Sequence, residues 1–359
     1  MKISFIIPGF FKSGGIRIIF EYANRLCAKG HDVTVYVPTK NYYLYKDEFS
    51  PLKYLKYKYR ELFKQNSKRD LSFFGINRFK VMIVGSVTNK NIQDADIIFA
   101  TSWPTAYDLK KLAASKGEKI YFIQDYEVWE SNKKAVDKTY TFPFHYITIS
   151  KFLHDYLLNR FKSDSFVIKN GIDLEKYNIE SKIGSDKIRI TFIVNELRKK
   201  NVTAAINAID KIHSEYPDIE VKCFGLLKSK IVPHYARYIE NPTEEEIIKI
   251  YCETDIFVYP SIFEGFGLPP AEAMACKCAV VSNKVGAIPD YSRHLYSAYL
   301  CNPENNEEIY EGIKYLLENV NEISRISENA YNEVRSYFNW EESVNSMESY
   351  LNKIYNHIE

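Results

Sequence analysis

The sequence predicts an α/β protein made of two doubly wound, Rossmann-like domains that face each other across a cleft. Two observations support this fold class. A strand–loop–helix–strand unit opens the chain at residues 2–37 and recurs at residues 188–225. Most later strand candidates are unbroken apolar runs, which are typical of parallel strands buried on both faces.

The first domain is expected at residues 1–178. An apolar strand over residues 2–7 leads into the loop PGFFKSGG, and apolar residues then recur at helical spacing from Ile16 to Cys27. Gly30 ends this helix, and HDVTVYV is the next strand. The segments VMIVG, DIIFAT, KIYFIQ and HYITIS are further strand candidates.

The second domain is expected at residues 186–339, after the polar stretch ESKIGSDK. The strand IRITFIV, the loop NELRKKN, a helix from Val202 to Ile212 and the strand IEVKCFG repeat the opening order. DIFVYPS and CAVVSN are the buried strands that follow. The last helix, at residues 340–359, has an apolar face that we expect to pack back on the first domain.

Composition narrows the class of protein. The chain has 359 residues, and 48 Lys and Arg oppose 46 Asp and Glu, so the net charge of +2 does not indicate a nucleic-acid partner. Six cysteines without a C-x-x-C pair are interpreted as buried free thiols in a reducing compartment. The start, MKISFIIPGF, is too short for a signal peptide, and no stretch has the length of a membrane-spanning helix. We therefore expect a cytoplasmic protein.

Two loops at the expected carboxyl ends of strands could bind an anion. Gly14 and Gly15 precede the first helix, where a glycine pair lets backbone amides approach a phosphate, although a tight turn without a ligand is equally consistent. This is not the G-x-G-x-x-G pattern of nicotinamide enzymes. Arg198, Lys199 and Lys200 occupy the corresponding loop of the second domain and could neutralise a pyrophosphate or form a solvated basic face.

The segment SIFEGFGLPPAEAM places two carboxylates around a predicted turn. Gly265, Phe266, Gly267 and Leu268 form the turn, whose amides could point at a phosphate, and the following proline pair can open a helix. Glu264 is expected in the loop and Glu272 in the first helical turn. There, interaction with the helix dipole alone could also explain a carboxylate. Two acids beside a phosphate-binding turn suggest that each holds hydroxyl groups of one sugar-bearing ligand.

These residues strongly resemble the retaining glycosyltransferases of family 4, which have the GT-B fold. The resemblance rests on four segments in order: SGG…LCAKGHDVTVYV, ITISKFLHDYL…VIKNGIDLEKY, DIFVYPSIFEGFGLPPAEAMACKCAVVSNKVGAIPD and FNWEESV. The third, with its E-x(7)-E pair, is the most specific. The segments ATSWPTAYDL and YFIQDYE are similar in sequence to those of rhamnosyltransferase-type members, which suggests a deoxysugar donor.

The resemblance implies a role for each part of the site, with a nucleotide-diphosphate sugar as the donor and no metal or other cofactor. Glu272 would hold the ribose and Glu264 a hydroxyl of the transferred hexose or deoxyhexose near its anomeric carbon. The amides of Phe266, Gly267 and Leu268 would support the diphosphate. The remaining assignments are Gly14, Gly15, Arg198, Lys200 and Gly265 to donor binding, Asp125 together with Glu264 to catalysis, and Trp103, Tyr107 and Gln124 to the acceptor side.

Three positions depart from the family pattern. Glu196 stands where an arginine is expected, and Arg198 is then the candidate substitute. Gln124 and Asp125 occupy the place of a common histidine, and Lys277 replaces a glycine. These departures keep open a catalytically silent GT-B subunit that supports an active partner. Another GT-B enzyme, such as a sugar-nucleotide epimerase, is a third possibility.

Two further stretches carry clusters of charged residues. DAD at residues 94–96 resembles the metal-binding D-x-D of another glycosyltransferase fold, but it would lie at the wrong end of its strand. Residues 51–69 carry seven basic side chains against Glu61 and have an apolar helical face. This helix could lie on an anionic membrane and bring the enzyme to a glycan or lipid-linked acceptor in cell-surface polysaccharide synthesis, or it could simply be a packed amphipathic helix.

Overall fold

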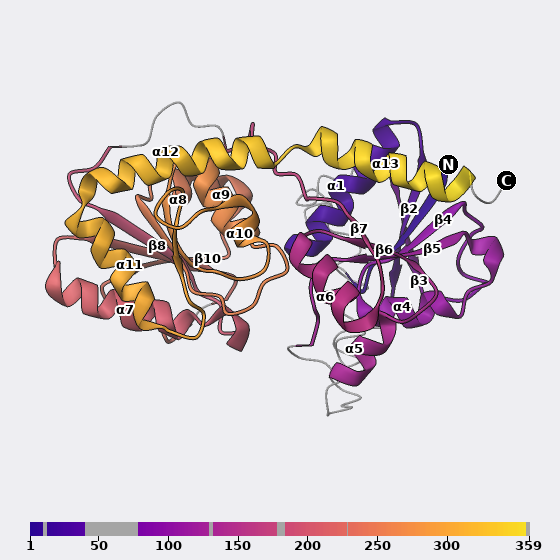
Figure 1. Cartoon of the computed structure of the whole chain (residues 1–359), viewed down its shortest axis with the longest axis horizontal. Helices are drawn as coiled ribbons and strands as arrows, with labels where there is room; N and C mark the ends of the chain where they lie inside the picture. Colours follow the sequence, from indigo (N-terminus) through magenta and orange to yellow (C-terminus); the bar gives the residue numbers. More distant parts are fainter. Residues whose placement is uncertain (10–12, 40–77, 129–131, 178–183, 228, 357–359) are drawn as a thin grey trace. The chain divides into compact units, whose positions relative to one another are not determined.

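The computed structural model describes residues 1–9, 13–39, 78–128, 132–177, 184–227 and 229–356. The chain forms two compact units (Figure 1). The first comprises Met1–Ile149, Leu153–Ile168 and Glu341–Glu359, and the second comprises Ser150–Phe152 and Lys169–Trp340. Each unit is a parallel sheet with helices on its faces, so the prediction of two Rossmann-like α/β domains is confirmed.

The sheet of the first unit has the strand order β3-β2-β1-β4-β5-β6-β7 among the described residues. Every neighbouring pair is parallel. Its strands are β1 (Lys2–Ile6), β2 (Asp32–Pro38), β3 (Lys80–Val84), β4 (Ile97–Ala100), β5 (Glu118–Ile123), β6 (His145–Thr148) and β7 (Phe166–Val167). The order changes direction between β1 and β4, which brings the loops after these strands to one edge of the sheet.

The helices around this sheet begin where the sequence supplies caps. Helix α1 (Gly14–Ala28) starts after Ser13, whose hydroxyl accepts the amide of Ile16, and it buries one apolar face. The other helical elements are α4 (Trp103–Lys110), η2 (Ala114–Lys116), α5 (Lys133–Thr139), α6 (Lys151–Phe161) and α13 (Trp340–Asn356). Within this unit Glu348 of α13 pairs with Lys29 at 2.7 Å and with His31 at 3.0 Å.

The sheet of the second unit has the order β10-β9-β8-β11-β12-β13, again with parallel neighbours. Its strands are β8 (Arg189–Ile193), β9 (Glu220–Gly225), β10 (Arg237–Glu240), β11 (Ile256–Tyr259), β12 (Ala279–Asn283) and β13 (Tyr299–Cys301). Strands β11 and β12 are fully buried, as their apolar sequences predict.

Helices cover both faces of this second sheet. They are η3 (Arg198–Lys200), α7 (Val202–Glu215), α8 (Glu244–Cys252), α9 (Leu268–Ala275), α10 (Ile288–Tyr291), α11 (Glu307–Glu318) and α12 (Val320–Tyr337). Helix α7 packs against α11, whereas α9 and α10 pack against α12 (Figure 1). Thr243 and Glu246 form a capping box that starts α8.

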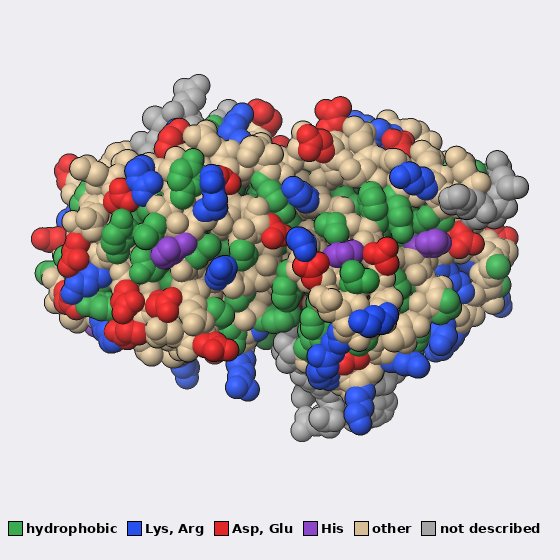
Figure 2. Space-filling model, in the orientation of Figure 1, with side chains coloured by type: hydrophobic (Ala, Val, Ile, Leu, Met, Phe, Trp, Pro, Cys, Tyr) green, Lys and Arg blue, Asp and Glu red, His purple; other side chains and the backbone are tan. Residues whose placement is uncertain are grey.

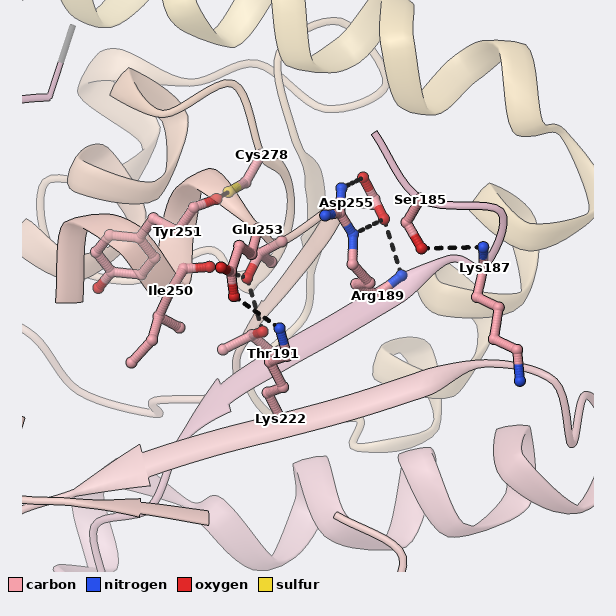
Figure 3. Close-up of polar contacts among 11 residues, drawn as sticks. Ser185, Lys187, Arg189, Thr191, Lys222, Ile250, Tyr251, Glu253, Asp255 and Cys278 are labelled. Atoms are coloured by element: carbon pink, nitrogen blue, oxygen red, sulfur yellow. Dashed lines mark hydrogen bonds and ion pairs between the residues drawn. The ribbon is translucent and has the colours of Figure 1, made fainter. Parts of the chain in front are cut away.

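Polar pairs fix the amino ends of the strands in the second sheet (Figure 3). The carboxylate of Asp255, just before β11, accepts hydrogen bonds from the backbone amide of Arg189 at 2.8 Å and from its guanidinium at 2.9 Å. Lys222 of β9 pairs with Glu253 at 2.8 Å. These charges are satisfied within the fold, so the opposite, carboxyl edge is the place to seek a ligand site.

The acidic pair at residues 94–96 has the same kind of structural role. Asp94 pairs with Lys116 at 2.7 Å, and Asp96 accepts the amide of Lys2 at 2.6 Å. Both precede β4 and thus lie at its amino end. Across the residues described, no group of three His, Cys, Asp or Glu side chains could hold a metal ion.

Surface and core agree with the composition. Acidic and basic side chains are interspersed over the face shown in Figure 2. Five of the six cysteines are buried, and Cys27 is half-buried. No helix in the described ranges combines the length and apolar character needed to cross a bilayer.

Candidate functional site

The loop between β11 and α9 places Glu264 at the carboxyl edge of the second sheet. Although it is a charged residue, Glu264 is only 8% exposed. A buried carboxylate is costly unless other groups neutralise it and hydrogen-bond to it. Two neighbours meet this need.

Lys200 and Tyr259 converge on the same oxygen of Glu264. The ammonium of Lys200 pairs with Glu264 Oε1, and the hydroxyl of Tyr259 donates to Oε1 at 2.7 Å. Lys200 Nζ also donates to the Tyr259 hydroxyl at 3.0 Å. Lys200 lies in η3, which follows β8, whereas Tyr259 ends β11 and Glu264 lies in the loop after it, so the pairing of β8 with β11 brings the three groups together.

The second acid, Glu272, is 6% exposed and lies within α9. Our prediction that it occupies the first helical turn is wrong, because the helix begins at Leu268 and Glu272 is its fifth residue. An interaction with the helix dipole is therefore a weak explanation for a carboxylate at this buried position. Burial, then the charge of Glu264 and further that of Glu272, raise the pKa of Tyr259 well above its usual value of 10. Both acids therefore act on one tyrosine.

Gly267, the residue just before α9, has a conformation that suits glycine. Its φ is 81°, and a Cβ there would lie 2.7 Å from the side chain of Ile288. The hydroxyl of Tyr291 donates to the Gly267 carbonyl at 2.6 Å. Among the residues described, no side-chain hydrogen bond caps the start of α9. Gly265, Phe266 and Gly267 precede the helix, as the sequence predicts, whereas Leu268 is already its first residue and not part of the turn.

The basic residues in the loop after β8 differ in their burial. Lys200 is half-buried against Glu264, whereas Arg198 is exposed. Glu196 accepts a hydrogen bond from Ser229 at 2.7 Å. The amide of Ile262 donates to the carbonyl of Lys199 at 2.9 Å, which ties this loop to the one that carries Glu264.

In the first unit, the predicted residues also lie after strands. We expected Gly14 and Gly15 in the loop before the first helix, and this prediction is wrong. They are the first two residues of α1, because Ser13 caps the helix. Gln124 follows β5 and donates through Nε2 to the carbonyl of Gly15 at 3.2 Å. The next residue, Asp125, accepts the amide of Tyr126 at 2.9 Å.

Trp103 and Tyr107 are successive aromatic positions on α4. Their rings meet edge to face with centroids 6.1 Å apart, and the Tyr107 hydroxyl donates to the carbonyl of Ala135 at 2.9 Å. Glu127, two residues beyond Asp125, accepts the amide of Trp103 at 2.7 Å. This contact joins the loops after β4 and β5.

The predicted residues fall into two groups, one in each unit, and the structure shows contacts of Gln124 with Gly15, of Trp103 with Tyr107 and of Lys200 with Glu264. Sequence reasoning missed Tyr259, Glu127 and Gly286, which contact or support these groups. Tyr259 carried a signal, because a hydroxyl ends an otherwise apolar strand five residues before Glu264. The basic stretch at 51–69 lies outside the described residues.

Comparisons with known proteins agree with this architecture. The profile of the family "Glycosyl transferases group 1" matches residues 175–333. Three proteins of Methanocaldococcus jannaschii, each named an uncharacterized glycosyltransferase, are 26% identical over 202, 269 and 224 residues. These matches cover 55%, 68% and 54% of this chain, but only 56%, 66% and 56% of the relatives. The O-antigen chain mannosyltransferase B of Escherichia coli is 41% identical over 56 residues, 16% of this chain and 15% of that protein.

Solved structures of low sequence identity share the fold. Sucrose-phosphate synthase from Thermosynechococcus elongatus aligns with a TM-score of 0.74 and 16% identity, covering 99% of this chain and 100% of that one. HepE of Anabaena in complex with UDP-glucose aligns with a TM-score of 0.72 and 15% identity, covering 98% and 100%. Residues 175–333 match the profile of the group 1 glycosyltransferases, and the solved structures share the fold, so the predicted resemblance to GT-B glycosyltransferases is confirmed at that level.

Proposed function

We propose that the chain is a retaining glycosyltransferase that moves a hexose or deoxyhexose from a nucleotide-diphosphate sugar to a glycan or lipid-linked acceptor. The observation that carries this proposal is the pair of buried carboxylates, Glu264 and Glu272, the first of which pairs with Lys200 of the basic loop at the carboxyl edge of the second sheet. Parallel α/β sheets bind their ligands at this edge.

Each part of the ligand has a matching group. Glu272 would hold the ribose hydroxyls, and Glu264 would hold a hydroxyl of the transferred sugar. The amides of Phe266, Gly267 and Leu268, with Lys200 and Arg198, would stabilise the diphosphate as it leaves. This stabilisation of the leaving group is the main catalytic effect that we assign to the second unit.

The first unit would supply the acceptor side. Asp125 is the proposed catalytic carboxylate, and Trp103 and Tyr107 offer aromatic faces on which a sugar can stack. Gln124 holds the first turn of α1, where Gly14 and Gly15 would admit a phosphate. The proposed chemistry needs no metal ion.

The comparisons support the substrate classes only in general terms. HepE was crystallised with UDP-glucose, and the mannosyltransferase relative acts on the O-antigen chain by its name. We therefore place the protein in polysaccharide or cell-surface glycan synthesis. Attachment to the inner face of the membrane through residues 51–69 is part of this proposal.

A second function has a specific observation in its favour. Glu196 occupies the position of the family's arginine and binds Ser229, and the candidate substitute Arg198 is exposed. A silent GT-B subunit that supports an active partner would tolerate these changes.

Turnover separates the two functions. Wild-type protein is incubated with UDP-glucose, GDP-mannose, dTDP-rhamnose or ADP-glucose and an octyl glycoside acceptor, and nucleoside diphosphate release is measured. We expect release from one donor, a product that retains the donor's anomeric configuration by NMR, and loss of about 100-fold or more in Glu264→Gln. Binding without release of nucleoside diphosphate from any of these donors would favour the silent subunit.

A further inference from the structure

Tyr259 occupies an unusual position for a tyrosine in a parallel sheet. It is the last residue of β11 and is 4% exposed, and its ring stacks on Phe257 with centroids 6.1 Å apart. The buried strand and this ring contact hold the tyrosine in place. Its hydroxyl is consequently a fixed point, whereas Glu264 and Lys200 belong to loops and have flexible side chains.

The hydrogen-bonding capacity of the three groups is divided in a particular way. A tyrosine hydroxyl has one hydrogen to donate and lone pairs to accept with. Tyr259 donates its hydrogen to Glu264 Oε1 and accepts one from Lys200 Nζ. Lys200 donates a second hydrogen to the same Oε1. Oε1 is thereby occupied twice.

The remaining capacity is what a ligand could use. Among the residues that the structure describes, no hydrogen bond reaches Glu264 Oε2, and Lys200 has one ammonium hydrogen beyond the two already used. One acceptor oxygen and one charged donor thus stay side by side. A ligand that carries a hydroxyl group next to a phosphate group satisfies both.

We propose that Tyr259 is a positioning residue that holds Glu264 and Lys200 in fixed register, so that one ligand hydroxyl and one ligand phosphate are bound together. The inference rests on the proposed function and adds a residue that the sequence pattern did not single out. Tyr259 does not touch the ligand in this account. It acts through Glu264 and Lys200.

The test compares Tyr259→Phe with Tyr146→Phe. Tyr146 is a matched control, because it is also buried and its hydroxyl donates to the backbone carbonyl of Phe142 at 2.6 Å, but it lies in the first unit. The first readout needs no activity. Wild type and both variants are acetylated with an N-hydroxysuccinimide ester, and the rates at Lys199 and Lys200 are measured by mass spectrometry.

We expect acetylation of Lys200 to become about fivefold faster or more in Tyr259→Phe, because one of its two polar contacts is lost, while Lys199 and the Tyr146→Phe protein are unchanged. The second readout uses UDP with UDP-glucose and GDP with GDP-mannose. The rate of sugar release from each donor is measured without an acceptor. For the donor that wild type hydrolyses, the kcat of this hydrolysis should fall about tenfold in Tyr259→Phe. Affinity for the free nucleoside diphosphate should change less than about threefold, because it lacks the sugar.

Wild-type rates of Lys200 acetylation or of sugar release in Tyr259→Phe would overturn the inference, as would equal losses in Tyr146→Phe. A different result would contradict the proposed function but not the positioning role of Tyr259. If Tyr259→Phe exposes Lys200 but the wild-type protein binds none of the four nucleotides, the positioning of Lys200 stands and the donor site does not.

Discussion

Gly286 lies in direct contact with the backbone of Glu264. A Cβ at position 286 would be 2.3 Å from the Glu264 carbonyl oxygen and 3.2 Å from the Glu264 Cβ. Gly286 also has a φ of 57°, a conformation that L side chains rarely adopt. The loop after β12 thus sets the position of the acid in the loop after β11.

Gly286→Ala is therefore expected to move Glu264. The backbone oxygen cannot yield as a flexible side chain would, so we expect unfolding to become easier by about 2 kcal/mol or more, with loss of nucleotide-sugar binding. Gly85→Ala is the control, because a Cβ at position 85 would meet no atom within 4 Å. Urea unfolding and a thermal-shift titration measure both effects. Equal behaviour of the two variants would mean that the contact with Glu264 is unimportant.

Lys277 replaces a glycine of the family pattern, and the structure shows why glycine suits this place. Its φ is 55°, just after α9. The side chain is half-buried, pairs with Glu328 at 3.0 Å and lies over the ring of Tyr331 at 4.8 Å. Lys277→Gly and Lys277→Ala both remove these contacts, but only glycine relieves the backbone. We expect the glycine variant to be about 1 kcal/mol more stable than the alanine variant in urea unfolding. An alanine variant of equal or greater stability would contradict this.

The two candidate cations of the basic loop should differ in importance. Lys200→Met leaves the buried carboxylate of Glu264 without its cation, so we expect a loss of about 2 kcal/mol in unfolding free energy. Arg198→Met removes an exposed side chain and should stay within about 0.5 kcal/mol of wild type. Nucleoside diphosphate affinity, measured by calorimetry, should fall in both variants if Arg198 substitutes for the missing arginine. Unchanged affinity in Arg198→Met would remove it from the donor site.

The ion pairs of Glu348 make the stability of the first unit depend on pH. The hydrogen bond from Lys29, with a smaller contribution from His31, holds the pKa of Glu348 below its usual value of 4.5. A lowered pKa stabilises the fold at pH values above 4.5, and this contribution is lost as the pH falls through the folded-state pKa. Glu348→Gln should therefore cost up to about 1 kcal/mol at pH 7, and this cost should shrink as the pH falls below 4.5. Urea unfolding at a series of pH values tests this, and a cost that does not decrease with falling pH would point to packing instead.

Much of the fold followed from the sequence. The apolar runs at 256–259 and 279–283 and the helical spacing after Ser13 and Asn201 define elements whose order allows little but parallel sheets. Glu264 was also visible as a candidate, because a glutamate just before a glycine-rich turn that follows a buried strand has no simple structural explanation.

The contacts that organise the site could not be predicted. Lys200 and Glu264 are 64 residues apart, and their contact depends on the adjacency of β8 and β11 and on the shape of two loops. Tyr259 looked like a core residue of an apolar strand, and its role depends on where the hydroxyl lies. The position of Glu272 depended on the start of α9, which lies at Leu268 and not at the proline pair. Helix starts are uncertain from sequence by a residue or two.

The central claim is that Glu264 and Glu272 bind one nucleotide sugar. The most direct measurement is a thermal-shift panel of UDP-, dTDP-, GDP- and ADP-sugars with wild type, Glu272→Ala and Glu272→Gln. Glu311→Ala, at an exposed position of α11, is the control. We expect one nucleotide family to stabilise wild type and Glu311→Ala but neither Glu272 variant. Stabilisation that survives in both Glu272 variants, or no stabilisation of wild type by any of these sugars, would contradict it.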